Sequence, residues 1–105
     1  MVKLTVLYDL PVEADHAEFI RWRTTEHHAE NLSQPGVIKS DFYIVKRAWR
    51  RDSAPYSYLT ESYFLDMATF EKSFLDPGYQ KILAPSLERI ANPLFLISEE
   101  VVGLS

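Results

Sequence analysis

The chain contains no cysteine and only three glycines among its 105 residues. The absence of cysteine excludes a disulfide framework, a thiol nucleophile and any metal site built on thiolates. Three glycines are too few for the glycine-rich loops that bind phosphate groups. No apolar run approaches the roughly 18 residues of a membrane span, and the opening MVKLTVLY is too short and too alternating for a signal peptide. We therefore predict a cytoplasmic protein without a membrane partner.

Positive charge is also scarce. The chain has 11 Lys and Arg against 15 Asp and Glu, a formal net charge of −4 at pH 7. This balance argues against a nucleic acid or an anionic membrane as partner. The one basic cluster surrounds Trp49 and comprises Lys46, Arg47, Arg50 and Arg51. It falls at the tip of a predicted hairpin, where a solvated turn is a better interpretation than an anion or nucleic-acid site.

Apolar and aromatic residues are plentiful, at 47% and 13% of the chain, which excludes a disordered protein. The length predicts a single domain spanning residues 1–105. A domain of this size buries about 60–65% of the surface of its unfolded chain, so oligomerisation would add useful stability.

Hydrophobic periodicity predicts four strands and three helical segments. Alternating apolar residues indicate strands at 2–8, 37–49, 56–64 and 94–102. Helical spacing and capping residues indicate helices at 16–33, 66–74 and from 77 onward, the last with a break or kink at Pro85. The order β-α-β-β-α-β predicts an α+β fold with a ferredoxin-like subunit and a four-stranded antiparallel sheet.

Helices on one face of such a sheet leave the other face bare. That face carries several large apolar side chains, namely Tyr43, Val45, Leu59, Tyr63 and either Leu94 or Phe95. Because this is more apolar area than a monomer normally exposes, we expect a homodimer in which two sheets pack face to face.

The segment from Asp15 to Gly36 carries all three histidines and is predicted to form one long helix. Asp15 and Glu18 resemble a capping box, and Gln34-Pro35-Gly36 ends the helix. At about 100° per residue, one stripe of this helix combines apolar and ionisable residues: His16, Phe19, Ile20, Arg23, His27 and Glu30. Such a stripe favours a helix that lines a wet cavity. The alternative is an inward face rotated toward Trp22 and Ala29.

Four stretches together resemble the EthD family of dimeric α+β barrel proteins: MVKLTVLY, TEHHAENLSQPGV, PYSYLTESYFLDMATFEKSFLDPGYQ and FLISEEVV. The resemblance covers essentially the whole chain. It implies a ferredoxin-like subunit, a homodimer joined through its sheets, and a pocket between sheet and helices. The wider superfamily includes cofactor-free oxygenases, cyclases, lactone isomerases and haem-handling proteins.

The resemblance also implies that a histidine shortly before the Pro-Gly turn is an acid/base catalyst. Here that residue is His27 or His28; relatives often have a proline soon after this histidine, but Ala29, Glu30 and Asn31 follow here. His27 shares the stripe of Arg23, and either histidine can instead be a structural or surface residue.

Arg23 can stabilise an oxyanion or orient a carboxylate; alternatively it pairs with Glu26 or Glu30. Other residues are expected to line a substrate pocket: Phe19, Ile20, Tyr8, Tyr58 and Glu61. The alternative for Glu61 is a place at the rim of the dimer interface.

Metal and cofactor binding have little support in the sequence. His27 and His28 point about 100° apart on a regular helix, and no HxxxH or HExxH spacing exists, so no metal site is predicted. A single histidine is compatible with haem, but nothing selects it. We predict a cofactor-free enzyme of proton transfer, isomerisation or oxygenation on a small hydrophobic or aromatic molecule. The alternative is a non-catalytic ligand-binding or accessory protein of the same fold.

Overall fold

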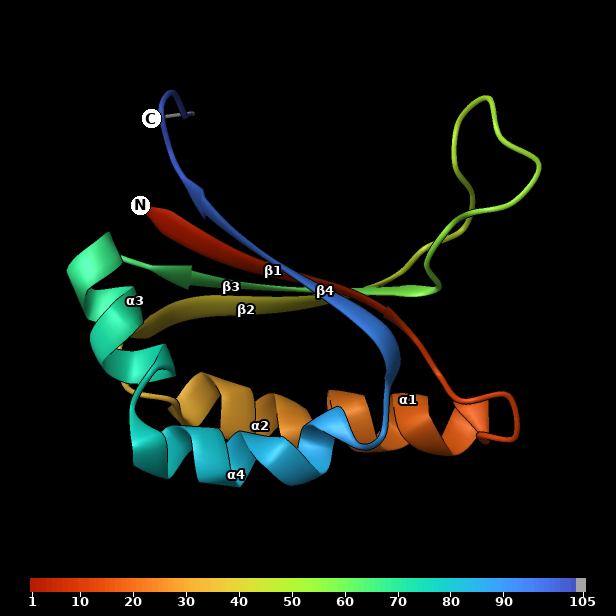
Figure 1. Ribbon diagram of the computed structural model, residues 1–105, viewed down its shortest axis with the longest axis horizontal. Helices are drawn as coiled ribbons and strands as arrows, with labels where there is room; N and C mark the ends of the chain where they lie inside the picture. The colour runs from red at the N-terminus through yellow and green to blue at the C-terminus, as the bar shows by residue number, and fades with distance from the viewer. Residues whose placement is uncertain (104–105) are drawn as a thin grey trace.

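The computed structural model describes residues 1–103, in which one sheet is covered by helices on one side (Figure 1). The strands are β1 (Val2–Asp9), β2 (Val37–Ile44), β3 (Tyr58–Phe64) and β4 (Ala91–Glu99). They are antiparallel and lie in the order β2-β3-β1-β4. The helices are α1 (His16–Thr24), α2 (Glu26–Ser33), α3 (Met67–Phe74) and α4 (Pro77–Leu87). The predicted ferredoxin-like fold is confirmed. Each of its two helical connections consists of two helices, α1 and α2 between β1 and β2, and α3 and α4 between β3 and β4.

The core lies between the sheet and the helices. Alternate residues of β1 point to the helices, namely Val2, Leu4, Val6 and Tyr8, and all are buried. On β3, Phe64 lies opposite Val2 and Tyr58 lies opposite Tyr8, so the aromatic side chains of β3 complete the same layer. Burying one such side chain contributes about 1.5–3 kcal/mol, and this layer therefore fixes which face of the sheet the helices cover.

Several predicted strand bounds were wrong. β2 ends at Ile44 instead of residue 49, β3 begins at Tyr58 instead of Tyr56, and β4 spans Ala91–Glu99 instead of 94–102. The pairing of β2 with β3 shifts register between Val37 and Lys39. This extra residue turns Val37 toward the core, although simple alternation had placed it on the opposite face from Phe42.

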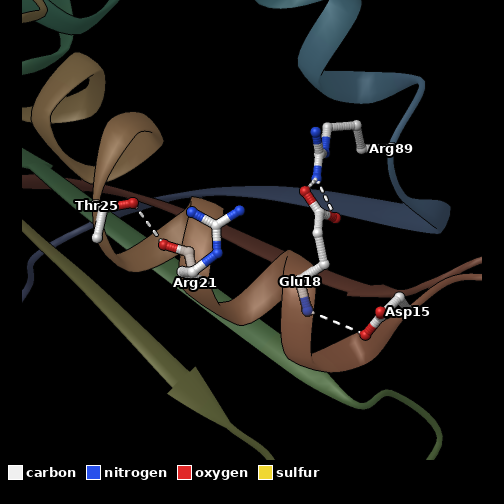
Figure 2. Close-up of polar contacts among 5 residues, drawn as sticks. All are labelled: Asp15, Glu18, Arg21, Thr25 and Arg89. Carbon is white, nitrogen blue, oxygen red and sulfur yellow. Dashed lines mark hydrogen bonds and ion pairs between the residues drawn. The ribbon is translucent and has the colours of Figure 1, made fainter.

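The predicted single helix from Asp15 to Gly36 was also wrong, because the chain breaks at Thr25. Thr25 has φ −116° and ψ −90°, outside the helical region. Its hydroxyl donates a hydrogen bond of 2.6 Å to the carbonyl of Arg21, drawn in Figure 2. A threonine hydroxyl that bonds the preceding turn competes with the helical backbone ladder, and here it accompanies the end of α1.

The predicted helix starts are confirmed by their caps. Asp15 accepts from the backbone N–H of Glu18 (Figure 2), Asp66 from that of Thr69, and Asp76 from that of Tyr79. Pro85 does not break its helix in the middle, since α4 continues to Leu87 and ends there.

The sheet face that points away from the helices is bare (Figure 1). On β4, the pairing with β1 places Leu94 and Leu96 on this face and Phe95 toward the helices, which settles the alternative left open by the sequence. Leu94, Leu96 and Tyr43 are 40%, 43% and 53% exposed. The bare face therefore combines large apolar side chains with substantial solvent exposure.

Gly36 provides a test of the turn that leads from α2 into β2. Its φ of +84° is favourable for glycine, and a Cβ there would lie 2.8 Å from Thr69 Cγ2. We expect Gly36→Ala to lower the free energy of unfolding by roughly 1–2 kcal/mol, measured by urea denaturation. In a Thr69→Ser background, which lacks Cγ2, the loss should be smaller. Equal losses in both backgrounds would contradict the steric part of this account.

Candidate functional site

A cavity of about 70 Å³ lies between the sheet and the helices. Its walls come from β1, β3 and β4 on one side and from α1, α2, α3 and α4 on the other. Leucine, valine and phenylalanine side chains form much of the wall, together with a small set of polar groups. The volume is several times the roughly 10–15 Å³ that one water needs, so a small organic molecule is a suitable occupant.

Arg23 is the most deeply buried charged residue of the site. It lies on the inward face of α1, one helical turn after Phe19, and its exposed fraction is only 2%. One guanidinium nitrogen donates to Thr60 Oγ1 at 3.3 Å, and the guanidinium carbon lies 4.8 Å from the centre of the Phe42 ring. Burial lowers the pKa of Arg23 from its ordinary value, because the charged form is poorly solvated there.

The predicted ion pairs of Arg23 with Glu26 or Glu30 do not form. Among the described residues, no carboxylate oxygen lies within 4 Å of the Arg23 guanidinium. Glu30 instead lies 3.6 Å from His27 Nδ1, and its side chain is 56% exposed. Within the described residues, the buried guanidinium of Arg23 therefore contacts only groups without a formal negative charge.

Two hydroxyl groups lie beside Arg23. Tyr8 Oη and Thr60 Oγ1 are 3.0 Å apart, and both residues line the cavity. Burial raises the pKa of Tyr8, while Thr60 and the Arg23 charge oppose this rise. Tyr8 is thus a protonated phenol near neutral pH, able to donate a hydrogen bond to a ligand.

His27 lies on the cavity side of α2. Its ring stacks on Trp22 at a centroid distance of 4.4 Å, and its Nδ1 lies 3.4 Å from Ser86 Oγ of α4. The side chain is 14% exposed. Burial lowers the pKa of His27, the Arg23 charge lowers it further, and Glu30 opposes both effects. Near neutral pH the ring is therefore uncharged and can accept a proton.

Trp22 is itself held by Arg89, which follows α4. The Arg89 guanidinium lies 4.1 Å from the centre of a Trp22 ring. Arg89 also donates two hydrogen bonds of 2.7 Å to Glu18, as Figure 2 shows. These contacts tie the start of α1 to the segment after α4 and so fix the wall on which His27 stacks.

His28 lies outside the main cavity. It borders a shallow surface hollow together with Arg23, Ser40 and Phe42. Its Nδ1 is 3.4 Å from a guanidinium nitrogen of Arg23. Because arginine only donates, Nδ1 of His28 is the acceptor in this contact. The structure thus places His27 in the cavity wall and His28 beside Arg23 at the surface hollow.

Of the predicted pocket residues, Tyr8 and Phe19 line the cavity. Ile20 does not, because it packs against the core beside the cavity. Tyr58 is buried in a stack of aromatic rings, and its hydroxyl lies 2.6 Å from His16 Nδ1 outside the cavity wall.

Glu61 was placed wrongly in the pocket. It lies on the bare face of the sheet, where its carboxylate is 2.7 Å from Lys3 Nζ. Strand alternation is the reason, since Thr60 and Ser62 on either side of it point to the cavity. Glu61 therefore lies on the sheet face that the alternative interpretation requires, and its place at the rim of a dimer interface stays a prediction.

Most polar residues of the cavity wall were not predicted from the sequence. These are Asn31, Gln34, Thr60, Ser62, Tyr79 and Ser86. Helical spacing could have identified the first two, because Asn31 and Gln34 lie four and seven residues after His27 and therefore on the same side of the chain. Alternation along β3 could have identified Thr60 and Ser62, since they share a face with Tyr58 and Phe64.

The described residues contain no group of three or more His, Asp or Glu side chains arranged to hold a metal ion. Within the same residues, no helix is both long and apolar enough to cross a membrane. The basic cluster near Trp49 lies in the loop between β2 and β3, where Trp49 is exposed and stacks with Arg50 at 4.3 Å.

The lowered pKa of His27 predicts a pH dependence of stability. An unfolded chain binds a proton on this residue below about pH 6.5, whereas the folded protein binds it only at lower pH. Folding stability should therefore decline as pH falls through this interval and level off below the folded pKa. Urea denaturation between pH 7.5 and 5 measures the decline. His27→Gln should flatten it, and an undiminished decline in this variant would contradict the account.

Comparison with known proteins supports the fold. No protein-family model matches the chain, and no curated protein sequence does so. Solved structures do match. An EthD family protein from Bacillus halodurans is 18% identical with a TM-score of 0.75, covering 96% of this chain and 99% of its own. The cofactor-independent oxygenase SnoaB from Streptomyces nogalater is 18% identical with a TM-score of 0.67, covering 98% and 95%.

A third similar structure is a hydroxynitrile lyase from Passiflora edulis. It is 11% identical with a TM-score of 0.72, covering 98% of this chain and 96% of its own. All three identities are low, so these matches establish the shared ferredoxin-like fold. The resemblance to the EthD family is confirmed at that level, and the same fold carries both an oxygenase and a lyase.

Proposed function

We propose that this protein is a cofactor-free enzyme that moves a proton on a small hydrophobic or aromatic molecule, with His27 as acid and base. The observation that carries the proposal is His27 itself: an uncharged histidine, stacked on Trp22, in the wall of a largely apolar cavity. General acid/base catalysis works best when the catalytic pKa lies near the operating pH and the group is rigidly held.

The chemistry that suits these residues is enolisation of a ketone or lactone. With the Nδ1 proton of His27 directed to Ser86 or Glu30, the Nε2 lone pair is free to take a proton from the carbon next to the carbonyl. The electron pair of the broken C–H bond moves to the carbonyl oxygen. One of the Tyr8 and Thr60 hydroxyls can donate a hydrogen bond to that oxygen, because the other donates within the 3.0 Å contact between them. Return of the proton at another carbon gives an isomer.

The experiment begins with a thermal-shift screen of small lactones, ketones and phenols, since a ligand that binds the folded state raises the unfolding temperature. Each binder is then incubated with the protein in D₂O, and ¹H NMR follows the loss of its C–H signals. Accelerated exchange of a proton next to the carbonyl supports the proposal. Binding without any acceleration would favour the alternative, a non-catalytic ligand-binding protein.

The proposal includes a homodimer formed through the bare face of the sheet. Leu94 and Leu96 from β4 and Tyr43 from β2 leave large apolar surfaces in solvent there. A second copy related by a two-fold axis would cover each of them with the equivalent face. The cavity lies on the opposite side of the sheet, so pairing through this face leaves the cavity of each subunit intact.

A further inference from the structure

The cavity contains a buried positive charge without a counter-ion. Arg23 is 2% exposed, it lines the cavity, and no carboxylate of the described residues reaches it within 4 Å. An unpaired buried charge is strongly unfavourable, and proteins normally place a carboxylate beside it. Here the cavity wall itself includes no Asp or Glu.

The neutral partners of Arg23 satisfy only part of its capacity. The guanidinium has five N–H groups, and the contacts described above use one for Thr60 and one for His28, with the Phe42 ring nearby. A planar guanidinium can bind both oxygens of a carboxylate in parallel, which makes it well suited to an acidic ligand.

We propose that the cavity binds an organic acid whose carboxylate pairs with Arg23 while its hydrophobic part contacts the apolar side chains of the wall. The inference rests on the proposed function insofar as it names the substrate class of the same cavity: a small carboxylic acid, aromatic or aliphatic. Arg23 is then a binding residue that supplies the counter-charge to the substrate. His27 acts on a carbon of the same molecule.

The lining of the cavity supplies both kinds of contact that such an acid needs. Trp22, Phe74, Leu83 and Phe95 supply its apolar lining. Arg23, Tyr8 and Thr60 form a connected polar group, joined by contacts of 3.0 and 3.3 Å. An amphipathic acid matches both parts, whereas a wholly apolar ligand would leave the guanidinium unpaired.

The test compares benzoate with benzamide, which has almost the same shape and no charge. Isothermal titration calorimetry of the wild-type protein should show benzoate binding more tightly by about 10- to 100-fold, since hydrogen bonds to a charged partner exceed neutral ones by this order. In ¹H NMR, bound benzoate should also raise the pKa of His27, because the anion offsets the Arg23 charge. If benzoate does not bind, or binds no better than benzamide, the proposal is wrong.

Substitution of Arg23 tests the residue itself. Arg23→Met should abolish the preference for benzoate and raise the unfolding temperature, because it replaces an unpaired buried charge with an apolar side chain of similar length. Arg21→Met is the matched control, as it removes the same charge from an exposed position of α1 and should change neither property. Retained benzoate preference in a folded Arg23→Met protein would overturn the proposal.

A third variant keeps the proposal testable if the Arg23→Met protein does not fold. Arg23→Lys keeps the charge and should keep a preference for benzoate, reduced because the two-pronged geometry is lost. The two proposals can also fail separately. Proton exchange that depends on His27, without any preference for benzoate, would refute the acid site alone. Benzoate selectivity without proton exchange on any substrate would refute the catalytic proposal alone.

Discussion

His27→Ala should lower the rate of substrate proton exchange by about 10²–10⁴-fold, the usual cost of losing a positioned general acid/base. The fold should persist, because the ring occupies the cavity wall and the main core lies between β1, β3 and the aromatic residues of α1 and α3. The rate is measured by ¹H NMR in D₂O on the substrate found in the screen. Circular dichroism verifies that the variant remains folded.

His28→Ala is the matched control for this prediction. His28 is adjacent in sequence and similar in chemistry, but it contacts the Arg23 guanidinium instead of lining the main cavity. Its loss should weaken substrate binding slightly and leave the exchange rate of bound substrate within a few-fold of wild type. A larger rate loss in His28→Ala than in His27→Ala would refute the assignment of His27 as the acid/base.

The pH profile gives a second measure of the same residue. The lowered pKa of His27 keeps its ring neutral, and hence active as a base, to below the usual value of about 6.5. The exchange rate should be flat at neutral pH and fall once the pH drops below the shifted pKa. A rate that already falls between pH 7.5 and 6.5 would show that another group titrates in the reaction.

Leu96→Asp should dissociate the homodimer. Leu96 lies on the bare face of the sheet, paired with Thr5 of the neighbouring strand, and it is 43% exposed in the single subunit. In a face-to-face dimer the carboxylate introduced at this position would be buried without a partner. The free-energy cost of that burial is large enough to prevent association at micromolar concentration. Sedimentation velocity should show about twice the monomer mass for the wild type and the monomer mass for the variant.

Ile82→Asp is the control for the dimer prediction. Ile82 lies on α4 in the helical layer and is 67% exposed, so the same change of an apolar residue to a charged one occurs away from the sheet face. This variant should remain dimeric. A wild-type protein that sediments as a stable monomer would contradict the proposed dimer, and dissociation by both variants would remove the sheet face as its explanation.

Much of the architecture followed from local patterns. Alternation along β1 predicted its buried face, because successive side chains of a strand point to opposite sides. Asp15, Asp66 and Asp76 marked helix starts, because each carboxylate can satisfy a backbone N–H one turn away. These features depend on neighbours in sequence, and the element order then left the ferredoxin-like arrangement as the simplest fold.

The site was predicted less well, for reasons that local patterns do not contain. The chain breaks at Thr25, and in the separate helix α2 His27 and Asn31 line the cavity while the Glu30 side chain is 56% exposed. A single helical wheel drawn through Thr25 does not contain this break. Simple alternation also failed for β2. The extra residue in the bulge near Val37 turns Val37 toward the core, on the face opposite to the predicted one.

The amino-acid sequence by itself determined the order of the elements, the buried face of β1 and the concentration of ionisable groups on the segment after Asp15, since all three follow from spacing along the chain. Only the tertiary structure decided that His27, and not His28, reaches the cavity and that Arg23 is buried with no carboxylate partner among residues 1–103. The physical reason is that burial and charge balance depend on the groups that other elements bring near. The guanidinium of Arg23 meets Thr60 of β3 and Phe42 of β2, and the ring of His27 meets Ser86 of α4, residues distant in sequence.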